Sequence, residues 1–301
     1  MKAAAEPMTA VAVIEKSRVA VFCELVKARL TLLVLITTLV GFYVGARGGL
    51  DWWLMTHTLL GTALLACGAA ALNQLIEREH DAKMRRTEGR PLPSGRMQPD
   101  TVLLFGGLSS MAGLIYLAVA VNLLTSLLGA ITLVTYVFVY TPLKRVTWLN
   151  TAVGAIPGAL PPLMGWTAAT GELAGAGWAL FAILFFWQIP HFLAIAWMYR
   201  DEYAKAGFVM LPGVDPTGER TAHQAVSHTI GLLMVSLCPV LFRVAGATYF
   251  FGALLMGVVF LVTAFAFARQ LNALRARQLF FASIIYLPLL LGLMVFDKIK
   301  Y

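Results

Sequence analysis

The chain has 301 residues, of which 59% are hydrophobic and only 13% charged, and its formal net charge is +8. An average soluble domain is about 45–50% apolar and about 25% charged. This composition therefore excludes a soluble globular enzyme, a disordered protein and a fibrous protein, and leaves a polytopic membrane protein. The apolar runs are long and unbroken, which favours helices over a barrel, whose strands alternate apolar and polar residues.

A helix needs about 20 predominantly apolar residues to cross a bilayer. Nine stretches are expected to do so: 30–46, 54–76, 102–120, 123–141, 150–169, 174–198, 225–242, 246–268 and 279–296. The fifth and sixth contain prolines, which membrane helices tolerate where the backbone faces protein or a cavity. We expect a cytoplasmic N-terminal segment, residues 1–26, and a single transmembrane domain, residues 27–301.

The basic residues fix the expected orientation. With nine spans, 19 of the 23 Lys and Arg residues, Lys2 among them, fall on the N-terminal side of the membrane. The other side has only Arg47, Arg243, Lys298 and Lys300. The positive-inside rule then puts the N-terminus in the cytoplasm and Tyr301 on the opposite face of the inner membrane. The net charge thus reflects topology, and no nucleic-acid partner is expected.

Acidic residues gather at the end of the second expected span, in NQLIEREHDAKMRRTEGRPLPSGR. Asn73, Glu77 and Asp81 stand at i, i+4 and i+8, so a helix places them on one face. One interpretation is a solvated helix end that pairs with the basic residues directly after it. Against this, Asn73 lies deep enough in the apolar run to need an internal partner.

A second cluster follows the sixth expected span, where Asp201 and Glu202 adjoin Arg200 and Lys205. The topology puts both clusters on the cytoplasmic side. Carboxylates from two helix ends, interleaved with Lys and Arg, supply what a Mg²⁺–pyrophosphate site requires: hard oxygen ligands and counter-charges for phosphate. Together the clusters predict a site for an isoprenyl diphosphate headgroup, with the isoprenyl tail among the helices.

Four segments carry a family resemblance: NxxxExxxDxxMxRTxxRPLPSGR (Asn73 to Arg96), YTPLKRVTWLNTAVGAIPGALPPLMGW (Tyr140 to Trp166), WQIPHFLAIAWMYRDEYAKAGFVMLP (Trp187 to Pro212) and, more weakly, FFASIIYLPLL in the ninth span. From about Lys27 onward the chain resembles the UbiA-type intramembrane prenyltransferase superfamily. The MxRTxxRPL and PHFxxxAW…MLP strings are typical of its haem-farnesylating branch. Glu77 stands where the superfamily more often has Asp, and the second cluster is DEY rather than DxxxD.

The resemblance implies a bundle of nine transmembrane helices with a cytoplasmic-facing active-site chamber. It also implies transfer of farnesyl from farnesyl diphosphate to a vinyl group of haem B, with water addition, to give haem O. One or two Mg²⁺ ions would bind the catalytic residues Asn73, Glu77, Asp81, Asp201 and Glu202, with the choice between the last two left open. The diphosphate would bind Arg86, Arg90, Lys144, Arg145 and Lys205, although Lys144 and Arg145 are alternatively simple topology determinants.

His191 follows Pro190 inside the sixth expected span, where an ionisable group is costly and usually functional. It is expected either to contact haem, with Tyr203 and Trp197 nearby, or to be a neutral histidine bonded to a neighbouring carbonyl. Aromatic faces can stabilise a farnesyl cation by about 0.5–2 kcal/mol each. Candidates for this role, which alternatively are interfacial anchors, are Tyr140, Trp166, Trp187, Phe192, Trp197 and Tyr203.

The expected partners are farnesyl diphosphate, haem B and the lipid bilayer, and the product suggests a haem A synthase or a terminal oxidase assembly as a protein partner. Two rival functions stay open. One is a superfamily enzyme that prenylates an aromatic quinone precursor, whose metal site would look the same. The other is a non-catalytic haem-binding or transport protein, although transporters place their charged sites near the bilayer midplane.

Overall fold

The structure is a computed structural model that describes residues 16–299. Lys2, Lys300, Tyr301 and most of the expected N-terminal segment lie outside this range. Within it the regular structure is helical: α1 (Arg18–Leu25), α2 (Ala28–Gly45), α3 (Trp52–Asp81), α4 (Pro99–Ala120), α5 (Leu123–Leu133), the π-helix η1 (Val134–Tyr140), α6 (Thr141–Leu143), α7 (Asn150–Thr170), α8 (Gly175–Met198), α9 (Arg200–Lys205), α10 (Leu211–Val214), α11 (Glu219–Leu241), α12 (Ala247–Arg269) and α13 (Ala273–Phe296).

In the described part of the chain, eight helical segments are long and apolar enough to cross a membrane: α2, α3, α4, the continuous stretch Leu123–Leu143, α8, α11, α12 and α13. The one expected span without a counterpart among these eight is the fifth, 150–169, which coincides with α7, a helix of 21 residues with three internal prolines. α7 is rich in proline and glycine, so it has fewer large apolar side chains than the helices beside it. The all-helical, multi-pass architecture is confirmed, and the count of nine spans stays a prediction.

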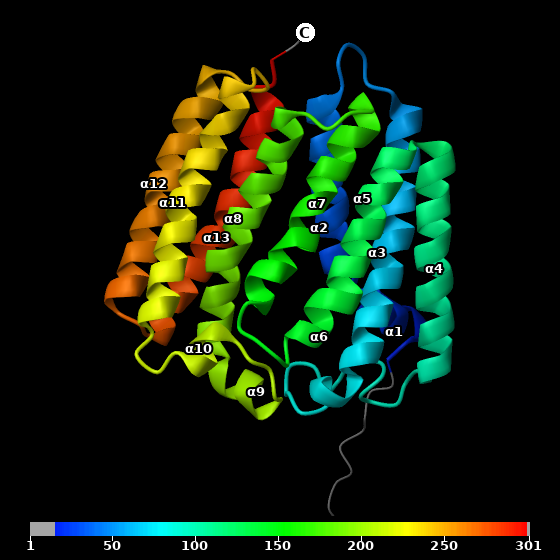
Figure 1. Ribbon diagram of the computed structural model, residues 1–301, viewed down its shortest axis with the longest axis vertical. Coiled ribbons are helices and arrows are strands. Elements are labelled where there is room, and N and C mark those ends of the chain that lie inside the picture. Colours follow the sequence, from blue (N-terminus) through cyan, green and yellow to red (C-terminus); the bar gives the residue numbers. More distant parts are fainter. Residues whose placement is uncertain (1–15, 300–301) are drawn as a thin grey trace, which may run out of the picture.

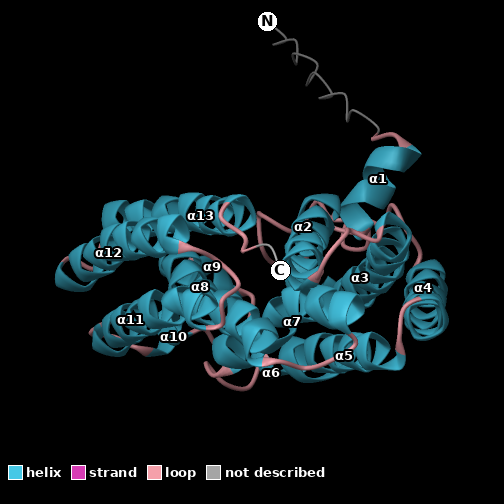
Figure 2. Cartoon of the chain, turned by 90° about the horizontal axis from the view of Figure 1, so that it is seen from above, coloured by secondary structure: helices cyan, strands magenta, loops and turns pink. Residues whose placement is uncertain are grey.

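The long helices run side by side, alternately up and down (Figure 1). Seen from above, α8, α11, α12 and α13 form one group and α2, α3, α4 and α5 another, with α7 between them (Figure 2). The short helices α1, α6, α9 and α10 gather at one end with the loop that follows α3, and α13 ends at the other (Figure 1). The loops predicted to be cytoplasmic therefore meet at a single end of the bundle.

Close helix packing holds the middle of the bundle together. A Cβ atom on Gly165 of α7 would lie 1.9 Å from the carbonyl oxygen of Thr38 on α2. Likewise, a Cβ on Gly41 of α2 would lie 1.9 Å from the carbonyl oxygen of Pro162 on α7. Glycine at both positions lets the two backbones approach, as small residues do where membrane helices cross.

The segment between α5 and α6 is a seven-residue π-helix, Val134–Tyr140. Such segments are rare and occur frequently at functional sites, because the extra residue in the turn redirects the side chains that follow. Here the rings of Tyr136 and Tyr140 stack with their centroids 5.8 Å apart. Thr141, the next residue, is fully buried against α3.

Candidate active site

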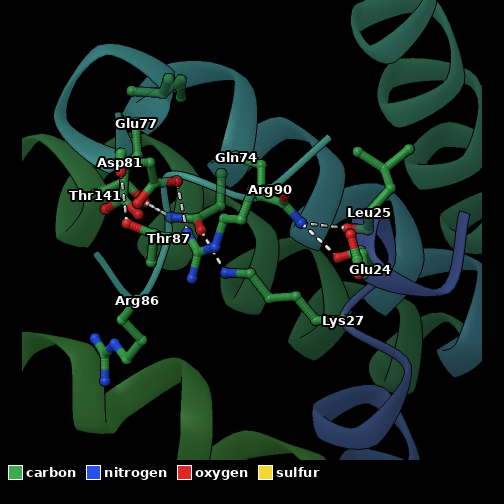
Figure 3. Close-up of polar contacts among 12 residues, drawn as sticks. Glu24, Leu25, Lys27, Gln74, Glu77, Asp81, Arg86, Thr87, Arg90 and Thr141 are labelled. Atoms are coloured by element: carbon green, nitrogen blue, oxygen red, sulfur yellow. Dashed lines mark hydrogen bonds and ion pairs between the residues drawn. The ribbon is translucent and has the colours of Figure 1, made fainter. Parts of the chain in front are cut away.

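The acidic row belongs to the last part of α3, which ends where the short helices gather (Figure 1), and Figure 3 shows Glu77 and Asp81 of the row among their partners. Asn73 is 0% exposed, Glu77 3% and Asp81 2%. The basic residues directly after the row, Lys83 and Arg85, are exposed instead of paired with it. A solvated helix end is therefore excluded, and the row takes its partners from elsewhere in the fold.

Each member of the row accepts a hydrogen bond from a cation of a different segment. The three pairs are Lys27 Nζ to Asn73 Oδ1 at 2.6 Å, Lys144 Nζ to Glu77 Oε1 at 2.7 Å, and Arg90 Nη1 to Asp81 Oδ2 at 2.6 Å. The cations come from the turn between α1 and α2, from the residue after α6 and from the loop after α3. We call these six residues the acid–cation cluster.

The pKa values of the two lysines of the cluster are shifted in opposite directions. Burial, followed by repulsion from Arg90, lowers the pKa of Lys27 to about 7. Burial also works against the charge of Lys144, but its interactions with Tyr140 and Glu77 outweigh this effect and raise the pKa of Lys144 above its ordinary value. The Lys144 ammonium also lies 4.5 Å from the centre of the Tyr140 ring. A carboxylate and an aromatic face thus stabilise the charged form of Lys144.

The orientation of the Asn73 amide is fixed by the π-helix. Thr141 Oγ1 donates to the carbonyl oxygen of Tyr136 at 2.8 Å, so it can only accept from the Asn73 amide nitrogen, 2.9 Å away. The amide oxygen Oδ1 consequently points toward Lys27. Asn73 has the internal partners that its depth in the apolar run predicted.

The loop after α3 connects the row to α9. Thr87 Oγ1 donates to the carbonyl oxygen of Asp81 at 2.7 Å. Arg86 donates to the hydroxyl of Tyr203 on α9 at 2.8 Å, and its guanidinium lies 5.4 Å from the ring centres of both Tyr199 and Tyr203. The second sequence cluster is therefore attached to the loop that carries Arg90.

The two acids of the second cluster face different surroundings. The Asp201 side chain is 86% exposed and lies beside Arg200. Glu202 Oε2 is buried and has no hydrogen-bond partner within the described residues. A buried carboxylate oxygen without a partner is unusual in a folded protein and needs an explanation. Of the two acids, Glu202 is the one that faces the protein interior.

Three other predicted residues lie outside the acid–cation cluster. Arg145 donates to the carbonyl oxygen of Ile76 at 2.8 Å, and Lys205 is exposed. Trp197 packs edge-to-face against Phe267 of α12, with ring centroids 5.7 Å apart. The structure does not bring these three side chains to the row.

His191 lies between two aromatic rings, Trp187 at 4.9 Å and Phe280 at 5.1 Å, both nearly parallel to it. Its Nδ1 is 2.7 Å from Ser283 Oγ, which in turn donates to the carbonyl oxygen of Phe280 at 2.5 Å. Because the serine proton is used there, Nδ1 must be the donor to Ser283. The partner is thus a hydroxyl rather than a carbonyl, and Nε2 keeps its lone pair, with no hydrogen bond among residues 16–299.

Comparisons with known proteins agree with this geometry. The sequence profile of the UbiA prenyltransferase family matches residues 34–285. The chain belongs to the UbiA prenyltransferase family. It is 48% identical to a "Protoheme IX farnesyltransferase" of Solibacter usitatus, over 92% of this chain and 98% of that protein. It is 45% identical to a protein of the same name from Koribacter versatilis, over 92% of this chain and 93% of the other.

Solved structures, several of them of UbiA homologs, share the fold. One, from work on digeranylgeranylglyceryl phosphate synthase in membranes, superposes with a TM-score of 0.80 at 14% identity and covers 93% of this chain and 98% of its own. A UbiA homolog from Archaeoglobus fulgidus, bound to GPP and Mg²⁺, has a TM-score of 0.64 at 15% identity, and the match covers 91% of this chain and 99% of that one. The predicted UbiA-like bundle is confirmed.

The donor atoms of this UbiA-family site suit a magnesium–diphosphate pair rather than a bare metal ion. In the described part of the chain, no three His, Cys, Asp or Glu side chains are grouped to hold a metal on their own. The row instead offers two buried carboxylates and one amide oxygen, and Glu202 adds an unpartnered carboxylate oxygen. These are the hard donors that Mg²⁺ prefers, and Mg²⁺ typically completes its shell with water and substrate phosphates.

Sequence patterns did not reveal several residues of this site. Tyr136 and Thr141 lie within an apolar span and reach α3 only through the π-helix. The sequence marks Lys27 only as one of the basic residues that set the topology, and no pattern distinguishes Gln74 beside Asn73. Their roles depend on contacts between segments distant in sequence, and no local spacing encodes such contacts.

Proposed function

We propose that this UbiA-family enzyme transfers the farnesyl group of farnesyl diphosphate to a vinyl group of haem B, with water addition, making haem O and releasing diphosphate. The observation that carries the proposal is the 48% identity with a "Protoheme IX farnesyltransferase" over nearly the full length of both chains. The acid–cation cluster supports it, because it combines hard oxygen donors with cations that match phosphate.

The diphosphate is assigned to the end of the bundle that holds the cluster. Asn73, Glu77 and Asp81, with Glu202 favoured over Asp201, would hold one or two Mg²⁺ ions, which supply charge neutralisation for the leaving diphosphate. Arg90, Lys144 and Arg86 provide phosphate partners; the two arginines offer planar, forked donors. Arg145 and Lys205, at the same end, strengthen the positive potential that attracts the anionic substrate.

The chemistry requires leaving-group stabilisation more than a strong base. The bond between farnesyl C1 and the diphosphate oxygen breaks, and its electron pair leaves with the diphosphate. The π electrons of the haem vinyl group then attack C1, and water captures the resulting cation and loses a proton. Tyr140 and Tyr136 offer aromatic faces beside the cluster for the farnesyl cation. No nucleophilic side chain is needed.

The haem is assigned to the neighbourhood of His191. Its Nε2 carries a lone pair in the tautomer that Ser283 imposes, which suits an axial ligand or an acceptor for water. Tyr203 lies close to the cluster through Arg86, whereas Trp197 packs toward α12. We therefore favour His191, then Tyr203, for contact with the acceptor.

The expected setting is the inner membrane, with the N-terminus and the cluster on the cytoplasmic side and the C-terminus opposite. The single domain of residues 27–301 contains every residue assigned here. A haem A synthase or a terminal oxidase assembly is the kind of partner that would consume haem O.

Two observations weigh against the rival functions. Eight relatives that are 39–48% identical to this chain all carry the name "Protoheme IX farnesyltransferase", which disfavours an aromatic quinone precursor as acceptor. The buried acids Glu77, Asp81 and Asp215 lie at the end of α3 and directly after α10, at one end of the bundle, whereas a transporter would place such charges near the midplane.

The deciding experiment is turnover by the purified protein in lipid nanodiscs with farnesyl diphosphate, Mg²⁺ and haem B. We expect a product with the mass of haem B plus a farnesyl group and water, and none with Asp81→Asn. Prenylation of 4-hydroxybenzoate in parallel, without any haem product, would contradict the proposal.

A further inference from the structure

Lys27 has an unusual backbone conformation in the turn between α1 and α2. It is the N-cap of α2 and has φ 48° and ψ 52°, in the left-handed region. A residue with a Cβ atom is strained there and keeps the conformation only when its surroundings enforce it. Such strain is often found at functional positions.

The helix that carries the acidic row also enforces this turn. Gln74, fully buried next to Asn73, donates to the carbonyl oxygens of Glu24 at 2.9 Å and Leu25 at 2.7 Å. Figure 3 shows these two bonds to the right of the Lys27 ammonium, and Glu77 and Asp81 to its left. Gln74 therefore fixes the end of α1, and the Lys27 side chain extends from that point to the row.

The partners of Lys27 differ from those of the other two cluster cations. Its ammonium donates to the neutral Asn73 Oδ1 and, at 3.2 Å, to the neutral hydroxyl of Tyr136. Arg90 and Lys144 each pair with a carboxylate. Within residues 16–299, Lys27 forms no ion pair, because the nearby carboxylates of Glu77 and Asp81 are already paired with Lys144 and Arg90, so no carboxylate contacts its partly buried ammonium directly. Burial of an unpaired charge is costly, and a bound anion would remove that cost.

We infer that Lys27 binds the diphosphate of the prenyl donor, as a third cation beside Arg90 and Lys144, and releases Asn73 Oδ1 when it does so. The inference rests on the proposed function and assigns it a binding residue. Both partners of Lys27 are neutral, so the ammonium gains a full counter-charge by moving to the anion. The same movement frees the amide oxygen, which the π-helix has already oriented, for a hard cation.

The test is direct binding of farnesyl thiolodiphosphate, a poorly reactive donor analogue, to the full-length protein with Mg²⁺ and without haem, measured by titration calorimetry. We expect Lys27→Gln to weaken binding tenfold or more and Lys27→Arg to recover most of the affinity. Lys83→Gln is the matched control. It removes the same charge from an exposed site at the same end and should bind within about twofold of wild type.

A second variant tests how Lys27 is placed. Gln74→Leu leaves every charge in place but removes the clamp on the turn, and we expect weaker donor binding with an unchanged haem KM. Circular dichroism and gel filtration of each variant check that the fold is kept. Equal affinity of wild type and Lys27→Gln overturns the assignment of Lys27 and leaves the proposed function standing. If wild type itself does not bind the analogue, both fail.

Discussion

At the scale of single residues, the site consists of oxygen acceptors that are already occupied by cations. The pairs Asp81–Arg90 and Glu77–Lys144 have carboxylate side chains only 3% and 4% exposed. Removing one partner of such a pair leaves an uncompensated buried charge, which is far more costly than loss of a surface ion pair. The isosteric amides are the informative changes, because an amide oxygen keeps the shape of the carboxylate and still accepts a hydrogen bond from Arg90 or Lys144, which are more exposed than the acids.

We expect Asp81→Asn and Glu77→Gln to abolish turnover while the protein remains folded and inserted, because each removes a charge that neutralises metal or phosphate. Glu202→Gln should reduce kcat/KM by at least tenfold more than Asp201→Asn, because the Asp201 side chain is 86% exposed. Product formation measured by mass, with and without EDTA, checks both expectations. Full activity in excess EDTA would show that the reaction does not require Mg²⁺.

Arg90→Lys keeps the charge beside Asp81 but loses the planar fork of the guanidinium. One lost charge-assisted bond is worth about 1.5–3 kcal/mol, which corresponds to roughly ten- to a hundred-fold in kcat/KM. We expect this loss when farnesyl diphosphate is varied and an unchanged KM for haem B. The check is a pair of titrations, each with the other substrate saturating. A change confined to the KM for haem B would contradict the assignment of Arg90 to the diphosphate.

Substitutions at His191 should affect the other substrate. We expect His191→Ala to impair haem B use and to leave donor binding nearly intact. His191→Ala and Ser283→Ala should both shift the Soret band of bound haem in the same direction, because without Ser283 the tautomer of His191 is no longer fixed. Ser283→Thr keeps the hydroxyl and should give the wild-type spectrum. Identical spectra for wild type and His191→Ala would exclude iron ligation by this residue.

At the scale of helices, the sequence predicted most of the fold because crossing a bilayer imposes length and hydropathy on each span. It also predicted the acidic row, because residues at i, i+4 and i+8 lie on one face of a helix. The sequence could not predict the π-helix, because VTYVFVY is equally compatible with an α-helix. The cation partners were also missed in part, since Lys27 and Asn73 are 46 residues apart and meet only through packing.

Glycine at the contact between α2 and α7 gives a prediction at this scale. A Cβ on Gly165 would meet backbone atoms, Thr38 O at 1.9 Å and Phe42 N at 2.7 Å, which cannot move without separating the helices. We expect Gly165→Ala to cost about 1–3 kcal/mol, as overpacking does. The control is Gly107→Ala on α4, where a Cβ meets nothing within 4 Å. Thermal unfolding in detergent should separate the two, and equal melting temperatures would refute the tight contact.

At the scale of the whole molecule, the two ends of the bundle are built differently. At the end away from the site, Lys298 donates to the carbonyl oxygens of Tyr43 at 2.6 Å and Ala46 at 2.7 Å, so the chain after α13 is tied to the end of α2. Asp297 also accepts from the backbone of Tyr249 on α12 at 2.6 Å. The Lys298 bonds connect the end of the last long helix to the first, and the Asp297 bond connects it to α12. At the site end, loops and short helices supply the cations, so substrate can displace them without separating the long helices.

The orientation of this asymmetric bundle is the last prediction. Basic residues are concentrated in the loops at the site end, so the positive-inside rule places the cluster in the cytoplasm. Single cysteines at Gly89, in the loop after α3, and at Gly49, at the opposite end, test this, because a Cβ meets nothing within 4 Å at either position. Cys23, Cys67 and Cys238 are first replaced by serine or alanine. In intact cells, a membrane-impermeant maleimide should label Gly49→Cys, and it should label Gly89→Cys only after permeabilisation. The reverse pattern would place the site outside the cytoplasm, away from cytoplasmic farnesyl diphosphate.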